Sequence, residues 1–83
     1  MLLNDPEFSK EYEALRPKYE AINLVIKNRL KKKMTQKDLA DKVGTKQANI
    51  SRFESGQINP SLEFVAKLAK AMDMKMDIKF RLG

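Results

Sequence analysis

The sequence predicts a mainly α-helical fold of about five helices that ends in one short β-strand. Three observations lead to this prediction. Apolar residues recur at helical spacing along most of the chain, Gly44 separates two short amphipathic stretches, and the apolar period changes to two after residue 73. With 83 residues, 42% of them hydrophobic, the chain can form one domain with a modest core. We divide it into an N-terminal helix (1–16), a central domain (17–72) and a C-terminal strand (73–83).

The composition excludes several classes of function. The chain has no cysteine and no histidine, which removes disulfides, zinc fingers, thiol nucleophiles and imidazole bases. It also has no paired acids and no glycine-rich phosphate loop, so we expect no enzymatic activity, no cofactor and no metal site. The first ten residues lack the apolar core of a signal peptide, and no apolar run approaches the ~18 residues of a membrane span. We therefore expect a cytoplasmic protein without a membrane partner.

The charge is distributed unevenly along the chain. The formal net charge is +6 and the isoelectric point is near 9.7. Residues 1–26 carry three basic and five acidic groups, whereas residues 27–83 carry 14 basic and six acidic groups. A weakly acidic start therefore precedes a basic body. This asymmetry is expected if the body faces phosphates and the start faces another partner.

Two helices are expected before residue 33. Asp5-Pro6-Glu7 is typical of a helix start, and Pro17 discourages the residue before it from staying helical. We therefore predict one helix up to Arg16 and another from about Pro17 to Lys32, although the two could instead form one kinked helix. Their expected apolar stripes are Phe8, Tyr12 and Leu15 in the first, and Ile22, Val25, Ile26 and Leu30 in the second.

Residues 36–54 are the most informative part of the chain. We expect helices at about 36–43 and 46–54, capped by Thr35 and Thr45 respectively. Gly44 between them suits the left-handed residue that ends a helix and turns the chain. The apolar sides of the two helices are Leu39, Ala40 and Val43 in the first, and Ile50 and Phe53 in the second. Two helices joined in this way form a helix-turn-helix; the alternative is an ordinary hairpin in a bundle.

After a loop at residues 56–60, a last helix is expected from its cap Ser61 to about Met72. Its expected buried residues are Leu62, Val65, Leu68, Ala69 and Met72. Apolar and charged residues then alternate strictly, which is typical of a half-buried strand. The apolar members are Met74, Met76, Ile78, Phe80 and Leu82. A lone strand needs a mate: the same strand of a second copy, which we favour, the sheet edge of another protein, or residues 1–3.

The run from Met34 to Ser61 closely resembles the DNA-binding domain of phage repressors and Cro proteins, the XRE-type helix-turn-helix family, whose fold is lambda-repressor-like. The matching elements are Thr35-Gln36, Leu39-Ala40, Gly44, Ile50-Ser51, Glu54, Gly56 and Pro60. The resemblance covers roughly residues 20–72. The flanks resemble antitoxins of the HigA type, which are small repressors that bind a ribosome-dependent mRNA-cleaving toxin and regulate their own operon.

A helical wheel predicts which side chains face DNA. With Ile50 and Phe53 directed inward, Ala48, Ser51 and Arg52 lie on the opposite side of the second motif helix, and Gln47 lies on its flank. Arg52 suits guanine, Gln47 suits adenine and Ala48 suits a thymine methyl. The predicted base contacts are therefore Gln47, Ala48, Ser51 and Arg52. The resemblance adds phosphate contacts at Gln36, Asn59 and Ser61, and we also expect contacts from Lys46 and Asn49.

Arg29 falls on the apolar stripe of its helix, where an unpaired charge is costly. Glu54 borders the buried side of the second motif helix. We therefore predict an Arg29–Glu54 ion pair that joins the two helices, and the family has this pair at matching positions.

Together these predictions describe a transcriptional repressor that binds a palindromic operator on double-stranded DNA as a homodimer. Within that description we favour an antitoxin whose N-terminal helix contacts a HigB-like toxin through Phe8, Tyr12 and Leu15. One alternative is a stand-alone phage-type regulator without a protein partner. Another is an adaptor that kept the fold without binding DNA, as in some eukaryotic coactivators that resemble this family.

Overall fold

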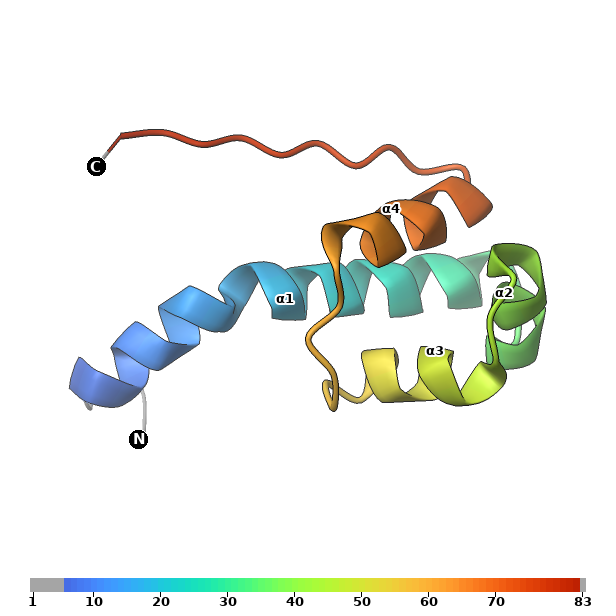
Figure 1. Cartoon of the computed structure of the whole chain (residues 1–83), viewed down its shortest axis with the longest axis horizontal. Coiled ribbons are helices and arrows are strands. Elements are labelled where there is room, and N and C mark those ends of the chain that lie inside the picture. The colour runs from blue at the N-terminus through green and yellow to red at the C-terminus, as the bar shows by residue number, and fades with distance from the viewer. Residues whose placement is uncertain (1–5, 83) are drawn as a thin grey trace.

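The computed structural model describes the backbone of residues 6–82 and the side chains of residues 15–82. It contains four helices, which are α1 (Pro6–Lys31), α2 (Gln36–Val43), α3 (Gln47–Glu54) and α4 (Leu62–Ala71). The long helix α1 forms one side of the domain, α3 and α4 pack against it, and α2 contacts both α3 and α4 (Figure 1). None of the four combines the length and the apolar character needed to cross a membrane.

Helix α1 is continuous through Pro17, so the prediction of two helices before residue 33 is wrong and the single-helix alternative holds. Proline removes one backbone hydrogen bond and bends a helix. Strong helix formers, among them Glu13, Ala14, Leu15, Glu20 and Ala21, stand on both sides of it. Their propensity keeps both flanks helical despite the missing bond. Arg16 and Pro17 therefore lie within the helix, and residues 6–16 are an extension of the core helix.

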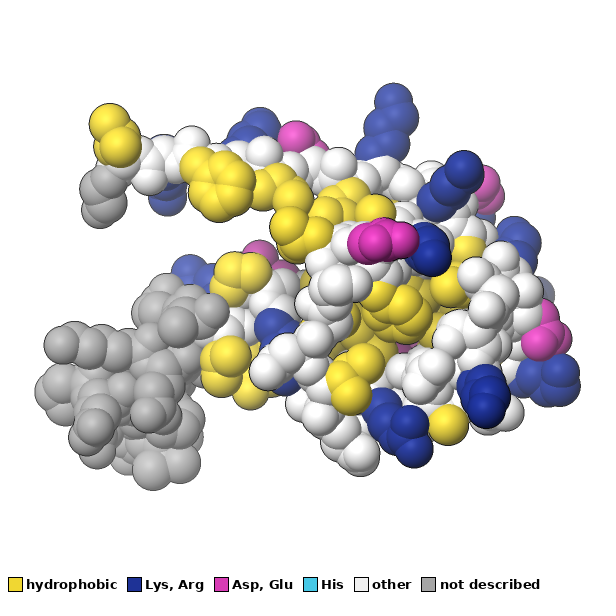
Figure 2. All heavy atoms as spheres, viewed as in Figure 1, with side chains coloured by type: hydrophobic (Ala, Val, Ile, Leu, Met, Phe, Trp, Pro, Cys, Tyr) yellow, Lys and Arg dark blue, Asp and Glu magenta, His cyan; other side chains and the backbone are white. Residues whose placement is uncertain are grey.

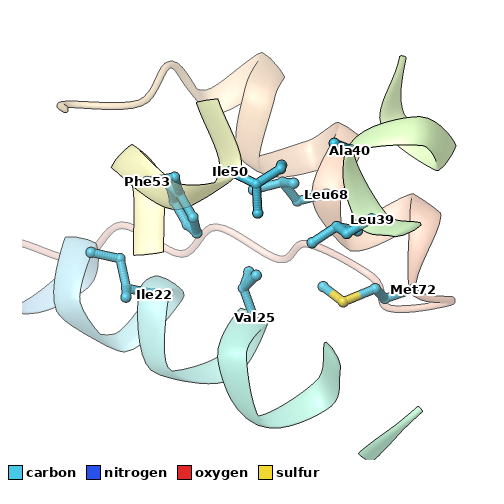
Figure 3. Close-up of a cluster of buried hydrophobic side chains, with 8 residues drawn as sticks. All are labelled: Ile22, Val25, Leu39, Ala40, Ile50, Phe53, Leu68 and Met72. Carbon is cyan, nitrogen blue, oxygen red and sulfur yellow. The ribbon is translucent and has the colours of Figure 1, made fainter. Parts of the chain in front are cut away.

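Every helix contributes to one hydrophobic core (Figure 3). Its buried members are Ile22, Val25, Leu39, Ala40, Ile50, Phe53, Leu68 and Met72. Phe64, half-buried on α4, packs edge-on against Phe53 with their ring centroids 6.0 Å apart. The predictions that Leu30 and Leu62 are buried are wrong, because these side chains are 60% and 64% exposed. Leu30 lies roughly 110° around α1 from the midpoint of Ile22 and Val25, and Leu62 lies roughly 70° around α4 from the midpoint of Leu68 and Ala69.

Local chemistry fixes the ends of the short helices. The Thr35 hydroxyl accepts a hydrogen bond from the Asp38 backbone N–H, and the Asp38 carboxylate accepts one from the Thr35 N–H, each at 2.9 Å. This capping box begins α2. Gly44 ends α2 with φ 85°, in the left-handed region. The Ser61 hydroxyl accepts from the Phe64 N–H at 3.0 Å and begins α4.

The C-terminal segment, residues 74–82, is extended but is not a β-strand, so the strand prediction is wrong for the single chain. The Met74 N–H donates to the Ala69 carbonyl at 2.8 Å, and from residue 75 to 82 the backbone makes no further backbone–backbone bond in the part of the chain that the structure describes. A ladder needs a second strand, and the described chain supplies none. Residues 1–3, one proposed mate, lie outside the described residues. The segment runs back past α4 on the side of the molecule opposite α3 (Figure 1).

Candidate nucleic-acid interface

Helix α3 has one anchored face and one exposed face. Ile50 and Phe53 are completely buried, and they fix the helix against the core. The opposite face carries the four residues predicted to reach bases, and each of them is exposed: Gln47, Ala48, Ser51 and Arg52. Helix α3 also lies at an edge of the molecule rather than between other elements (Figure 1). A helix presented in this way fits a B-DNA major groove, which is about 12 Å wide.

The start of α3 differs from the prediction. The residue that precedes the helix is Lys46, which makes no capping hydrogen bond with its side chain, so the expectation that Thr45 caps α3 is wrong. The Thr45 hydroxyl instead accepts a hydrogen bond of 2.8 Å from the Asn49 side-chain amide. Asn49 is thus half-buried and already bonded, which leaves one N–H of its amide for a phosphate. Lys46 is exposed beside the free N-terminus of the helix.

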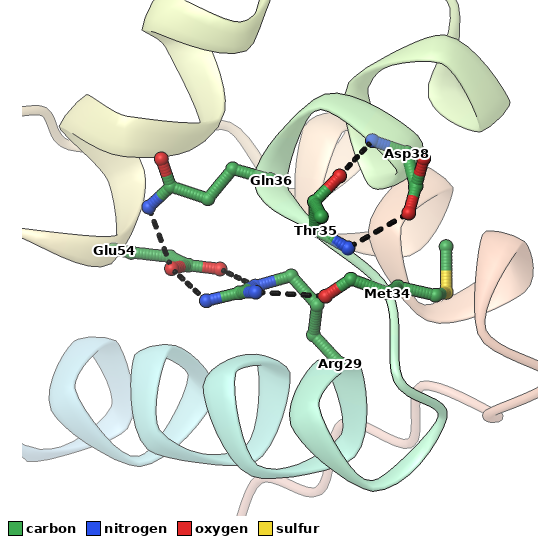
Figure 4. Close-up of polar contacts among 6 residues, drawn as sticks. All are labelled: Arg29, Met34, Thr35, Gln36, Asp38 and Glu54. Carbon is green, nitrogen blue, oxygen red and sulfur yellow. Dashed lines mark hydrogen bonds and ion pairs between the residues drawn. The ribbon is translucent and has the colours of Figure 1, made fainter.

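Gln36, one predicted phosphate contact, is placed by Glu54. Its side-chain Nε2 donates a hydrogen bond of 3.0 Å to Glu54 Oε1, and the side chain is half-buried (Figure 4). Because a primary amide has two N–H groups, one donor remains. The N-terminal turn of α2 adds backbone N–H groups and the positive end of the helix dipole, which favour an anion. Gln36 therefore combines a structural contact with a donor available to DNA.

The other two predicted phosphate contacts, Asn59 and Ser61, lie exposed in the loop between α3 and α4. Lys18 Nζ donates to Asn59 Oδ1 at 3.0 Å and to the Gly56 carbonyl at 3.1 Å. The Asn59 side-chain oxygen is thus occupied, and its amide N–H groups donate no hydrogen bond among the described residues. The Ser61 oxygen accepts the α4 capping bond, so its hydroxyl hydrogen remains to donate. Both side chains are therefore left with donors, which a phosphate requires.

Sequence reasoning missed Lys18. It lies on α1, 38 and 41 residues away from the two loop acceptors that it binds. It lies within the weakly acidic first 26 residues, and no neighbouring residue in the sequence connects it to the loop. The single available signal was that Lys18 is one turn before Ile22, on the side of α1 that turns toward the core.

The structure brings Arg29 and Glu54 together (Figure 4). Arg29 Nε donates to Glu54 Oε2 at 2.7 Å and Nη2 donates to Oε1 at 2.9 Å, a two-bond arrangement typical of arginine with a carboxylate. The third guanidinium nitrogen, Nη1, donates to the Met34 carbonyl at 2.9 Å. With the Gln36 bond, this network connects α1, the loop before α2, α2 and α3. The two ionic side chains are only 11% and 7% exposed.

The Asp38 carboxylate takes part in the capping box at the start of α2. Its pKa is held below the ordinary value, first by the hydrogen bond from the Thr35 backbone N–H and then by the Thr35 hydroxyl. The side chain is exposed, so its charge remains in contact with solvent. The Asp38 carboxylate of the capping box is therefore ionised at neutral pH.

Comparison with known proteins agrees with this geometry. A sequence profile described as helix-turn-helix matches residues 25–79. The chain belongs to the helix-turn-helix family, of the XRE type. A helix-turn-helix of this family is a DNA-binding domain. No solved structure matches the chain.

Several curated proteins are similar to this chain. "Multiprotein-bridging factor 1" of Candida glabrata is 31% identical over 70 residues, which cover 81% of this chain and 46% of that protein. "Endothelial differentiation-related factor 1 homolog" of Gallus gallus is 33% identical over 76 residues, covering 88% of this chain and 51% of that protein. An "Uncharacterized HTH-type transcriptional regulator" of Archaeoglobus fulgidus is 39% identical over 49 residues, covering 59% and 69% respectively. The chain thus spans about half the length of the first two.

Proposed function

We propose that this chain is a sequence-specific transcriptional regulator that inserts α3 into the major groove of double-stranded DNA. The observation that carries the proposal is the exposed row on α3, Gln47, Ala48, Ser51 and Arg52, on a helix whose other face is completely buried. Donors suited to phosphates lie near α3, at Gln36, whose amide bonds Glu54 at the end of this helix, and at Asn59 and Ser61 in the loop that follows it. Phosphate contacts fix the register of a protein on DNA, and base contacts then read the sequence.

One copy carries a single recognition helix, which provides few base contacts. We therefore propose that the operator is palindromic and is bound by a homodimer acting as a repressor. Two copies related by a two-fold axis read half-sites about one helical turn, ~34–36 Å, apart. The net charge of +6 favours approach to the phosphate backbone.

The decisive experiment selects bound duplexes from a randomised pool and then measures binding of variants to the selected and to a scrambled duplex. Arg52→Ala should cost about 1–3 kcal/mol on the selected duplex and relax one base position. Gln36→Ala should weaken both duplexes similarly. Lys67→Ala is the matched control, because it removes one exposed cation from α4, away from α3. If no duplex sequence is enriched, or if Arg52→Ala behaves like Lys67→Ala, the proposal fails.

The finer proposal is that the regulator is an antitoxin. It depends on the resemblance of the flanks to HigA-type antitoxins, and none of the relatives described above has a name that mentions a toxin. Of the three proposed toxin contacts, Leu15 is 40% exposed on α1, and the side chains of Phe8 and Tyr12 lie outside the described residues. Deleting residues 1–16 should spare DNA binding but abolish neutralisation of a toxin encoded beside the gene. Retained neutralisation would count against this role.

A second candidate function is an adaptor that connects proteins, and the names of the bridging-factor relatives favour it. A regulator bound through phosphates loses affinity steeply with salt, since each phosphate contact releases counterions. An adaptor that does not bind DNA shows no duplex binding at any salt concentration. Titration of a duplex at several salt concentrations therefore separates the two candidates.

A further inference from the structure

We propose that the C-terminal segment, residues 74–82, pairs with the same segment of a second copy, forming an antiparallel two-stranded ribbon with Ile78 on the two-fold axis. This inference rests on the homodimer in the proposed function and adds which surface forms the dimer and in which register the two segments pair. It can be tested without DNA, so it can fail while DNA binding by α3 holds, and the reverse is also true.

The C-terminal segment has backbone groups that the described chain leaves unpaired. It is extended and has the strict alternation of a strand, yet its backbone from residue 75 to 82 makes no backbone–backbone bond among the described residues. Exposure of its apolar side chains rises toward the end: Met76 is half-buried, Ile78 is 45% exposed and Phe80 is 92% exposed. An unpaired edge beside exposed apolar side chains is a template for another strand.

The surface beneath the segment is hollowed and largely apolar. Two adjoining grooves of about 380 and 390 Å³ lie between α1, α4 and the beginning of the segment, and both have mostly apolar walls. They share four lining residues, Pro17, Ala21, Val65 and Met76. Figure 2 shows apolar side chains in a continuous run from the segment toward the centre of the domain, with an open gap below the run. A two-stranded ribbon with its apolar side toward α1 covers this surface better than one strand does.

The order of residues in the segment favours pairing with a second copy over pairing with a different protein. In an antiparallel pair centred on Ile78, Met76 faces Phe80 of the second copy, and Met74 faces Leu82. Every apolar residue then meets an apolar residue, as cross-strand packing requires. On the outer side, Asp77 faces Lys79 of the second copy, twice by symmetry. Asp77 and Lys79 already lie on one side of the segment, 3.9 Å apart within the chain.

Neighbouring registers are less favourable. Moving the axis to residue 77 places Asp77 opposite itself and Lys75 opposite Lys79, and moving it to residue 79 places Lys79 opposite itself. Like charges directly opposite each other are destabilising. A one-residue slip of one strand would instead place apolar against charged side chains. The register centred on Ile78 does leave Lys75 opposite Arg81, but this pair lies near the exposed ends of the ribbon.

Cysteine cross-linking tests the register directly, because the chain has no cysteine of its own. On the axis, Ile78→Cys places two α-carbons about 4.5–5.5 Å apart, within the range that a disulfide accepts. Phe80→Cys is the matched control, since the two residues 80 then lie four residues apart along the ribbon, roughly 13 Å. Mild oxidation of the full chain should cross-link Ile78→Cys and leave Phe80→Cys largely uncross-linked. Equal cross-linking of both variants, or of neither, would overturn the register.

Sedimentation equilibrium of the full chain at low salt, without DNA, tests the dimer itself. Asp77→Lys should raise the dimer Kd about tenfold, because two attractive pairs become repulsive. The swapped variant Asp77→Lys with Lys79→Asp should restore the wild-type Kd, since the pairs re-form with reversed charges. Helical circular dichroism shows that each variant keeps its fold. A monomeric wild-type chain, or a swap that restores nothing, would overturn the proposal and leave capture of another protein's strand as the alternative.

Discussion

The Arg29–Glu54 ion pair allows the sharpest test of what holds the interface in place. We predict that Glu54→Ala lowers the free energy of unfolding by about 3–5 kcal/mol. The carboxylate accepts three hydrogen bonds, two from Arg29 and one from Gln36, and it is 7% exposed. Removing it leaves a guanidinium that is 11% exposed and bonded, among the described residues, to the Met34 carbonyl alone. An unpaired buried charge of this kind is expensive to retain.

The magnitude can be compared with the stability of the whole domain. At roughly 0.05–0.15 kcal/mol per residue, a domain of this size has about 4–12 kcal/mol in total. The single substitution should therefore bring the domain close to unfolding. The double substitution Arg29→Met with Glu54→Leu should cost much less than the sum of its parts, because it leaves no unpaired charge in the interior.

Urea unfolding followed by circular dichroism measures these differences. Asp41→Ala is the matched control, since Asp41 pairs with Lys37 at 3.1 Å but both side chains are more than 60% exposed. Exposed pairs of this kind contribute at most about 0.5 kcal/mol. The reasoning is refuted if Glu54→Ala costs no more than Asp41→Ala, or if the double variant costs as much as the two single variants together.

Three further predictions concern other parts of the site. Lys18→Met should weaken duplex binding about three- to tenfold, and its loss should not add to that of Asn59→Ala. The slope of the logarithm of the binding constant against the logarithm of the salt concentration should stay unchanged. A slope reduced by ~0.9 would show that Lys18 contacts a phosphate itself. Because the Asp38 pKa is lowered in the folded chain, its contribution is complete above the ordinary pKa of 3.8 and is lost as pH falls through the lower folded value. The stability advantage of the wild type over Asp38→Asn should therefore disappear in strong acid, as thermal unfolding across pH would show, and an advantage that persists there would exclude the capping explanation. Gly44→Ala should cost about 1–2 kcal/mol in urea unfolding, since φ is 85° and only the backbone conformation, not crowding, opposes a side chain; no loss would mean that the turn adapts.

Local rules predicted the centre of the chain well. Helices α2 and α4 begin at the caps Thr35 and Ser61, and α2 ends at Gly44, because capping is determined by residues within one turn. Burial of Ile50 and Phe53, and with it the exposed side of α3, follows from helical periodicity alone. These properties depend on short stretches, so the sequence contains all the information that they need.

Other features depend on contacts that no local pattern reveals. Whether Pro17 ends or merely bends α1 is decided by the sum of propensities on both sides of it. The contact of Lys18 with Asn59 joins residues 41 positions apart. The alternation in residues 74–82 correctly indicated an extended chain, but a ladder depends on a second strand, and the described part of one chain does not contain it.

The arrangement of the two surfaces bears on how the proposed activities combine. Figure 1 shows the C-terminal segment and α3 on opposite sides of the molecule, with α1 and α4 between them. A two-fold axis that runs from one side to the other through Ile78 places both α3 helices on the same side of the dimer, as two half-sites on one face of a duplex require. The ribbon then covers apolar surface without occupying the DNA-facing side. Strand pairing and DNA binding are therefore compatible, and for the adaptor candidate the same geometry leaves α3 free while another strand is bound.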